Sequence, residues 1–194
     1  NSGSLPDITD QAWQIFNCID YVFLNAGMVV RDMFINIGTE YMKKVINVNF
    51  FGAAIIAKTI LPLMIKRGGG HFVITSSLAG KYGIPKLSAY AASKHALHGL
   101  FESLRAEYGI DKIRISMVIT GLVKTHISEN SLLGNGNVSG KSQEAIAAGI
   151  SPEKCAAQIL KGVMKNKNEI VVGGLEKYTV FMNYLFPGFI AFII

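Results

Sequence analysis

The stretch HFVITSSLAGKYGIPKLSAYAASK, residues 71–94, places a short apolar run before a polar motif. The run at 71–75 is typical of a buried parallel strand, and Ser76 and Ser77 follow it directly. Open α/β sheets bind ligands at the carboxyl ends of their strands. We therefore expect these two hydroxyl groups to lie at a binding edge.

A tyrosine and a lysine stand four residues apart in the helix predicted next, at 88–108, with Gly109 as its carboxyl cap. At this spacing Tyr90 and Lys94 share one face of the helix. An ammonium group near a phenol stabilises the phenolate, so Lys94 is expected to lower the pKa of Tyr90 from its usual value near about 10. Such a phenol can donate and accept a proton.

Predicted strands and helices alternate on both sides of this stretch. The last helix opens with Ser151 as its cap and Pro152 at its first position, and the first follows Thr9 or Asp10 as a cap. The alternation predicts an α/β fold, a Rossmann-like doubly wound parallel sheet in three layers. The further strands are predicted at 19–24, 113–119 and 169–172, and the further helices at 12–17, 39–66 and 151–165.

Length and composition fit one domain, 1–194. Half of the residues are hydrophobic and 16% are charged, which argues against disorder. The net charge is +6, but the lysines are scattered and no basic stripe with interleaved aromatics occurs, so no nucleic-acid partner is expected. Cys18 and Cys155 have neither metal-ligand nor redox spacing, which favours a reducing compartment, and His95 and His98 lack a ligand set, so no metal is expected.

Asn49 interrupts the apolar stripe of the helix predicted at 39–66. A buried amide must be hydrogen-bonded, so Asn49 either ties a neighbouring backbone or holds a water in a site. The residues alone favour the structural tie.

Three further segments each allow two interpretations. The turn Asn25-Ala26-Gly27 either lets the backbone approach a bound group or simply ends a strand. The Gly-, Asn- and Ser-rich segment 124–150 is a substrate lid or a loose surface loop. The apolar tail 178–194 is a cover over a pocket or a subunit contact, with peripheral membrane contact as the second reading.

Five elements, in this order, closely resemble the short-chain dehydrogenase/reductase family of the classical type. The Tyr-x-x-x-Lys motif alone is weak, but five elements over about 120 residues are specific. They are Asn25-Ala26-Gly27, Val48-Asn49-Phe50-Phe51-Gly52, Ser77 placed thirteen residues before Tyr90, Tyr90-Ala91-Ala92-Ser93-Lys94, and Gly121-Leu122-Val123-Lys124-Thr125.

The resemblance implies a role for each catalytic position. Tyr90 would exchange a proton with the substrate oxygen, and Lys94 would lower its pKa and hydrogen-bond the nicotinamide ribose. Ser77 would polarise the substrate carbonyl. Asn49 would anchor a water that relays protons, which reverses the preference for a structural tie.

The resemblance also implies cofactor and substrate contacts. Thr120 stands where the family usually has Pro, which loosens that turn but removes no catalytic group. Leu78 and Ile84 would contact substrate. The cofactor-binding residues would be Asp7, Ile8, Asn25, Ala26, Gly27, Tyr90, Lys94, Gly121, Val123 and Thr125.

Within the family, the Ser76 to Lys81 stretch and the Gly-Leu-Val-Lys-Thr turn look most like the branch with the 11β-hydroxysteroid dehydrogenases and the dehydrogenase/reductase member 7 group, and the stretch after residue 172 looks like the 7B type. This implies an oxidoreductase that uses NADP(H), with NAD(H) as the alternative, on a lipophilic alcohol or ketone of steroid, retinoid or acyl type. A homodimer or homotetramer through the helices at 39–66 and 88–108, and a cytoplasmic or membrane-associated location, are also implied. The alternative is a catalytically silent binding or scaffold protein on the same fold.

The family opens with a strand, a Gly-rich turn that receives the pyrophosphate, and a second strand that selects NAD or NADP. The sequence contains none of these N-terminal elements, and its 7–25 segment is shorter than usual. Either residues of a longer protein precede this stretch, which is the favoured expectation, or it is a true fragment with little cofactor affinity.

Overall fold

The computed structural model describes residues 4–16 and 18–188, and a parallel sheet of four strands lies at its centre. The strands lie in the order β1-β2-β3-β4, which is also their order in the chain. Each predicted strand is present, with small shifts at the ends. Their bounds are Tyr21–Leu24 (β1), Gly70–Ser77 (β2), Ile113–Thr120 (β3) and Glu169–Val172 (β4).

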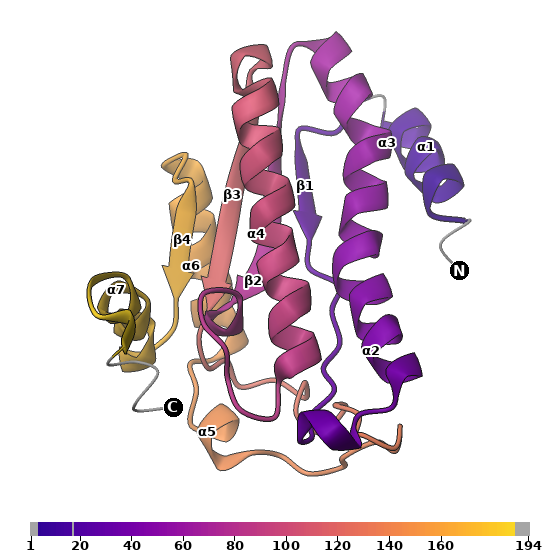
Figure 1. The fold of residues 1–194 in the computed structure, drawn as a ribbon. Helices are drawn as coiled ribbons and strands as arrows, with labels where there is room; N and C mark the ends of the chain where they lie inside the picture. Colours follow the sequence, from indigo (N-terminus) through magenta and orange to yellow (C-terminus); the bar gives the residue numbers. More distant parts are fainter. Residues whose placement is uncertain (1–3, 17, 189–194) are drawn as a thin grey trace.

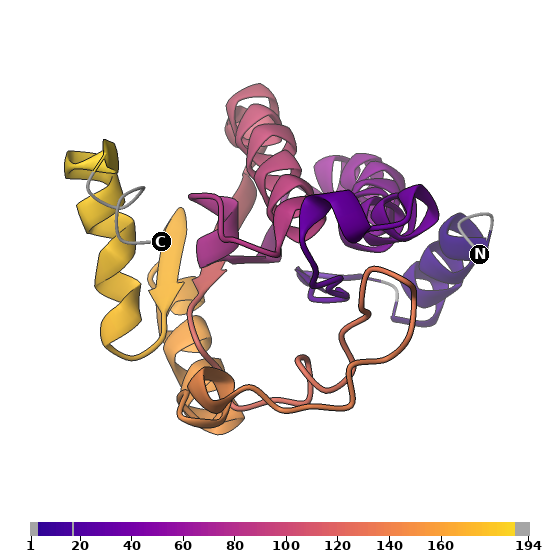
Figure 2. The ribbon, with the colours of Figure 1, turned by 60° about the horizontal axis from the view of Figure 1, so that its bottom comes forward.

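Helices cover both faces of this sheet (Figure 1). The helices α3 (Gly52–Arg67) and α4 (Ser88–Tyr108) lie on one face, and α6 (Pro152–Met164) lies on the other. This arrangement confirms the doubly wound, three-layer α/β class. Helix α1 (Leu5–Phe16) packs against α3 beyond β1, and α7 (Tyr178–Leu185) lies beside β4 at the opposite edge (Figures 1 and 2). The short elements are α2 (Thr39–Ile46), α5 (Glu144–Ala147), the π-helical turn η3 (Asn47–Phe51), and the 3-10 turns η2 (Phe34–Asn36), η4 (Leu78–Gly80), η5 (Gly109–Asp111) and η6 (Leu175–Lys177).

Apolar side chains fill both sides of the sheet. Along β2, Phe72 and Ile74 join the larger cluster under α3 and α4, whereas Val73 between them joins the cluster under α6. Alternate residues of a strand point to opposite faces, so the continuous apolar run of β2 is what two covered faces require. Leu97 and Phe101 of α4 close the larger cluster.

The longest helical run joins α2, η3 and α3 without a break, from Thr39 to Arg67. It is long and apolar enough to cross a membrane, with a mean hydropathy of 1.8 and 28% of its most apolar window buried, but core helices also meet these criteria. Ala57, Ile60 and Met64 pack into the core cluster, so the run serves as a core helix with one exposed face.

One predicted helix start was wrong, and one predicted helix end is confirmed. Helix α1 begins at Leu5, so Thr9 lies inside it and its hydroxyl donates to the Leu5 carbonyl (2.7 Å) instead of capping. Helix α4 ends at Tyr108 with Gly109 as its carboxyl cap, as predicted, although Gly109 keeps a right-handed helical conformation and continues into η5. Lys112 is the left-handed residue there, with φ 62°, because the chain tightens into a 3-10 turn before reversing.

The predicted lid, 124–150, crosses the carboxyl edge of the sheet as mostly irregular chain (Figures 1 and 2). The Leu132 N–H donates to the Val29 carbonyl (2.9 Å), and the Gly38 N–H donates to the Gly134 carbonyl (3.0 Å). These bonds tie the segment to the chain that follows β1. Its movement as a lid stays a prediction.

Candidate active site

Tyr90 and Lys94 lie one turn apart near the start of α4, and both side chains are buried. Tyr90 is 9% exposed and Lys94 is 3% exposed. The Lys94 Nζ atom lies 5.6 Å from the centroid of the Tyr90 ring. The structure therefore brings the predicted pair together on one face of the helix.

Lys94 is a buried cation without a carboxylate partner among the described residues. Its Nζ donates to the Thr75 carbonyl at the end of β2 (2.7 Å), and no ion pair joins it to the described part of the chain. Burial lowers the pKa of Lys94 to about 8. An ammonium has three N–H donors, so Lys94 can still donate to acceptors that enter the site.

Burial raises the pKa of the Tyr90 phenol, and the neighbouring Ser77 hydroxyl acts in the opposite direction. The net direction for Tyr90 is thus upward, opposite to the lowering expected from the sequence, and the effect of Lys94 on the phenol stays a prediction. The physical reason is that the desolvation of the phenolate outweighs other influences, and Lys94 bonds the Thr75 carbonyl instead of the phenol.

Ser77 ends β2 next to the phenol, as predicted. It takes an extended conformation, and its Oγ accepts a hydrogen bond from the Ala79 N–H of η4 (3.2 Å). Of the two predicted substrate contacts, Ile84 packs against the cluster that contains Tyr90, whereas Leu78 is buried beside Ser77 in the chain. Ser77, Tyr90 and Ile84 thus lie in one neighbourhood.

Asn49 lies in the π turn η3 and is 1% exposed. Its Oδ1 accepts from the Met28 N–H (2.8 Å), and its Nδ2 donates to the Met28 carbonyl (3.0 Å) and to Ser93 Oγ (2.9 Å). The side chain thus makes the structural tie that the residues alone favoured. Both amide protons are in use, so a water held by this side chain would donate to the second lone pair of Oδ1, and the relay role stays a prediction.

Asn25, Ala26 and Gly27 follow β1 at the same edge of the sheet and are exposed. The Thr75 hydroxyl donates to Asn25 Oδ1 (2.9 Å). A Cβ atom at Gly27 would lie 3.6 Å from Lys94 Nζ and 3.5 Å from Asn49 Oδ1, which are ordinary contacts. The predicted turn therefore borders the Lys94 site, and its contact with a cofactor stays a prediction.

The turn after β3 contains the other predicted cofactor residues. The Gly121 N–H donates to the Val172 carbonyl (2.7 Å), Val123 bridges to Ile150, and Thr125 is exposed. Since Ser77 pairs with Thr120 in the sheet, this turn begins beside the end of β2. It shares the carboxyl edge with Ser77.

Asp7 and Ile8 are not brought to this edge. Both are exposed residues of α1, which packs on α3 beyond β1 (Figure 1). Their adenine contact stays a prediction.

Sequence reasoning missed two contributors to the cluster. Ser93 links Asn49 to α4, because its hydroxyl also donates to the Tyr90 carbonyl (2.7 Å). Its place directly before Lys94 in the motif could have suggested a role. Thr75 acts through its backbone carbonyl, for which the sequence contains no signal.

A second polar cluster lies one turn further along α4. His98 contacts Ser76 Oγ through Nε2 (2.9 Å) and Glu102 Oε1 through Nδ1 (3.3 Å). His98, Glu102 and Glu169 offer three ligand atoms within 4.8 Å of one another, but Glu169 already pairs with Lys81. The expectation of no metal site stays a prediction.

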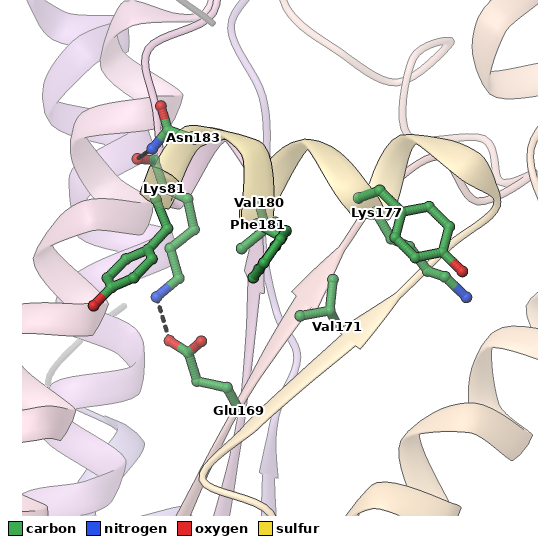
Figure 3. Close-up of a pocket in the computed structure, with 9 residues that line it drawn as sticks. Lys81, Glu169, Val171, Lys177, Val180, Phe181 and Asn183 are labelled. Atoms are coloured by element: carbon green, nitrogen blue, oxygen red, sulfur yellow. Dashed lines mark hydrogen bonds and ion pairs between the residues drawn. The ribbon is translucent and has the colours of Figure 1, made fainter. Parts of the chain in front are cut away.

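A cavity of about 500 Å³ lies between β4 and α7 (Figure 3). Tyr90 is not among the described residues that line it. The Lys81–Glu169 ion pair borders one side of it. Its apolar lining includes Val171, Tyr178, Val180, Phe181 and Tyr184.

Comparisons with known proteins agree with this fold. A family profile described as "short chain dehydrogenase" matches residues 2–135. The chain is 36% identical to "Dehydrogenase/reductase SDR family protein 7-like" of Drosophila melanogaster over 185 residues, 95% of this chain and 57% of that protein. It is 34% identical to "Dehydrogenase/reductase SDR family member 7B" of Bos taurus over 187 residues, 96% of this chain and 58% of that protein.

The chain thus spans a little over half the length of these relatives. A solved short chain dehydrogenase/reductase of Burkholderia phymatum in complex with NAD covers 95% of this chain and 72% of its own, with a TM-score of 0.81. At 20% identity this likeness concerns the fold alone. On the profile and the two relatives, the chain belongs to the short-chain dehydrogenase/reductase family, in the branch of family member 7.

Proposed function

We propose that this chain provides the proton-transfer centre of a nicotinamide-dependent oxidoreductase that interconverts a lipophilic alcohol and its ketone. The observation that carries the proposal is the buried Lys94 ammonium, which has one carbonyl partner and lies beside Tyr90. Burying a cation without a carboxylate is costly, so its retention is explained by a ligand.

The residues present fit a nicotinamide cofactor. Lys94 has N–H donors to spare for ribose hydroxyl groups, and the exposed turn at Asn25 to Gly27 lies beside it. A bound reduced nicotinamide would supply the hydride. The proposed preference for NADP(H) over NAD(H) rests on the resemblance to the member 7 branch.

In the direction of reduction, Tyr90 donates its phenolic proton to the substrate oxygen, and in oxidation it takes the proton back. Ser77 holds the same oxygen through its hydroxyl, next to the phenol. Lys94 stabilises the phenolate by its charge, with Nζ 5.6 Å from the centroid of the Tyr90 ring. Asn49 with Ser93 keeps α4 and the turn after β1 in register.

Apolar side chains around the phenol support a lipophilic substrate. Val29, Leu87 and Ala91 pack with Tyr90, and Ile84 covers this cluster from the loop before α4. A steroid, retinoid or acyl chain fits such a surface better than a charged molecule.

The test is turnover by the complete gene product with NADPH and NADH against a panel of lipophilic ketones. Ser77→Ala should lower kcat about 100-fold, since one donor to the developing oxyanion is lost. The matched control is Ser103→Ala, an exposed serine of α4, which should leave kcat unchanged. Absence of turnover and of cofactor binding in the wild type would overturn the proposal.

A second candidate function is a catalytically silent binding protein on the same fold. The observation that favours it is the 500 Å³ cavity under α7, whose described lining does not include Tyr90. Ligand binding that survives in a Tyr90→Phe variant without any turnover in the wild type would support this alternative.

Two exposed apolar surfaces support partner proposals. Val48 and Phe51 on the long helical run are exposed, which supports a homodimer or homotetramer through α2, α3 and α4.

Phe181 and Tyr184 of α7 are also exposed, which supports peripheral membrane contact. Part of the predicted tail, 189–194, lies outside the described residues. Light scattering and liposome flotation test these two proposals, and a monomer that stays in the aqueous phase would contradict both.

A further inference from the structure

Glu176 of η6 reaches across the sheet edge to the turn after β3. Its Oε1 atom accepts from the Leu122 N–H (2.8 Å) and from the Gly174 N–H (2.9 Å). A single carboxylate oxygen thus joins the Gly121–Thr125 turn to the chain that follows β4.

Glycines make this approach possible. A Cβ atom at Gly121 or Gly173 would overlap Glu176 Oε1. Gly173 also has a backbone φ of 154°, which residues with a side chain rarely adopt. The carboxylate therefore occupies a cradle of backbone that only residues without side chains can form.

The carboxylate is ionised in this cradle. Burial acts to raise the pKa of Glu176, but the backbone hydrogen bonds and the nearby Lys177 outweigh it, and the pKa is lowered. Charge-assisted hydrogen bonds of this kind are about twice as strong as neutral ones.

The same segment is tied to the loop that follows Ser77. The Thr179 hydroxyl donates to the Glu176 carbonyl (2.6 Å), so the Tyr82 hydroxyl, 2.6 Å away, donates to Thr179. Asn183 Nδ2 donates to the Lys81 carbonyl (3.3 Å), a contact on the cavity wall in Figure 3. The C-terminal segment thus connects both loops that border the catalytic edge.

We propose that Glu176 is a positioning residue for the nicotinamide end of the cofactor, because it holds the Gly121–Thr125 turn against the chain after β4. The proposal rests on the proposed function and on the predicted contacts of Gly121, Val123 and Thr125 with the nicotinamide and phosphates of the cofactor. Glu176 itself contacts neither substrate nor cofactor in this role. It fixes the backbone that does.

The test is fluorescence titration of NADPH into the complete gene product, since this affinity is read without turnover. Glu176→Ala removes the carboxylate and Glu176→Asp withdraws it by one methylene, so both should raise Kd about tenfold. Glu176→Gln keeps the reach of the oxygen and should stay within about threefold. The control Glu107→Ala, at an exposed glutamate of α4, should not change Kd.

Comparing the KM for the cofactor with the KM for the ketone distinguishes a positioning role of Glu176 from a general loss of stability. The cofactor KM should rise with Kd in the Asp variant, whereas the KM for the ketone should stay within about twofold, measured well below the melting temperature. If the Ala variant does not fold, the Asp and Gln pair carries the test. Wild-type affinity in Glu176→Asp would overturn the inference, whereas a wild type that binds no nicotinamide would overturn the proposed function instead.

Discussion

Lys94 and His98 lie one turn apart on α4, and both are buried, but their surroundings differ. Lys94 has one carbonyl partner, from Thr75. His98 is paired at both ring nitrogens, since Glu102 accepts from Nδ1 and the Ser76 hydroxyl satisfies Nε2. Lys81 and Glu169 also face His98, so four polar groups surround it.

We interpret this difference as one between the proposed functional group, Lys94, and a structural group, His98. A buried cation with spare donors lowers stability and is retained when a ligand uses it. A fully paired imidazole contributes to stability, because each buried polar atom has its partner. Removing the Lys94 side chain should therefore lower activity and spare stability, whereas removing the His98 side chain should lower stability and spare activity.

Lys94→Met gives the largest expected effect. The turnover number should fall about 1,000-fold, because the phenolate of Tyr90 loses its nearby charge. The free energy of unfolding at pH 7 should stay within about 1 kcal/mol of the wild type or exceed it, since a desolvated charge is removed. Lys154→Met, at an exposed lysine of α6, is the control. A strongly destabilised but active variant would contradict the contrast.

His98→Leu should show the reverse pattern. Ser76 and Glu102 lose their partner, so urea unfolding should show a loss of about 2 kcal/mol in stability. The turnover number should stay within about threefold. His95→Leu, at an exposed histidine of the same helix, should change neither quantity. If His98→Leu abolished turnover without loss of stability, His98 would belong to the reaction centre.

The pH dependence of stability should show two separate windows. Between pH about 8 and the ordinary lysine pKa of 10.5, the unfolded chain holds a proton that folded Lys94 has released, so stability rises with pH by about 3 kcal/mol. Burial lowers the pKa of His98, and Lys81 adds to this, so stability falls as pH falls below 6.5.

Differences between variants isolate each window. The pH profile of stability in Lys94→Met should lack the alkaline rise, and the profile of His98→Leu should lack the acidic loss. Subtracting each variant's profile from that of the wild type therefore leaves the contribution of the replaced residue. An alkaline rise of unchanged size in Lys94→Met would assign that window to another group.

Lys81→Met should have the smallest effect. The pKa of His98 should rise, because a cation that lowers it is gone, and NMR titration of the imidazole would measure this. Stability should change by less than about 1 kcal/mol, since Lys81 and Glu169 are partly exposed. An unchanged His98 titration would show that Lys81 does not act on the imidazole.

The sequence was sufficient to predict the four strands and the shared helix face of Tyr90 and Lys94. Apolar runs end in Ser, Asn or Gly where β1 and β2 end, and the Tyr90 and Lys94 spacing requires a shared helix face. The strands lie side by side in chain order, and each connection between them contains a helix. The start of α1 was missed because Thr9 resembles a cap but lies within the helix.

Contacts made by the backbone, or across long stretches of chain, could not be predicted. The Thr75 carbonyl and the Glu176 cradle depend on where distant segments meet. The direction of the Tyr90 pKa depends on burial, which the motif does not encode. The contacts of Asn49 belong to the same group. Its side chain lies in the π turn η3 and bonds the backbone of Met28, which is distant in the sequence.

The most direct test of the account is the single-turnover rate of ketone reduction by Tyr90→Phe at saturating cofactor. Removing the phenolic proton should lower the rate at least about 1,000-fold while cofactor Kd stays within about threefold. Tyr184→Phe, at an exposed tyrosine of α7, should behave as the wild type. A Tyr90→Phe rate within tenfold of the wild type would show that the proton comes from elsewhere, and the assignment of the α4 cluster as the reaction centre would be wrong.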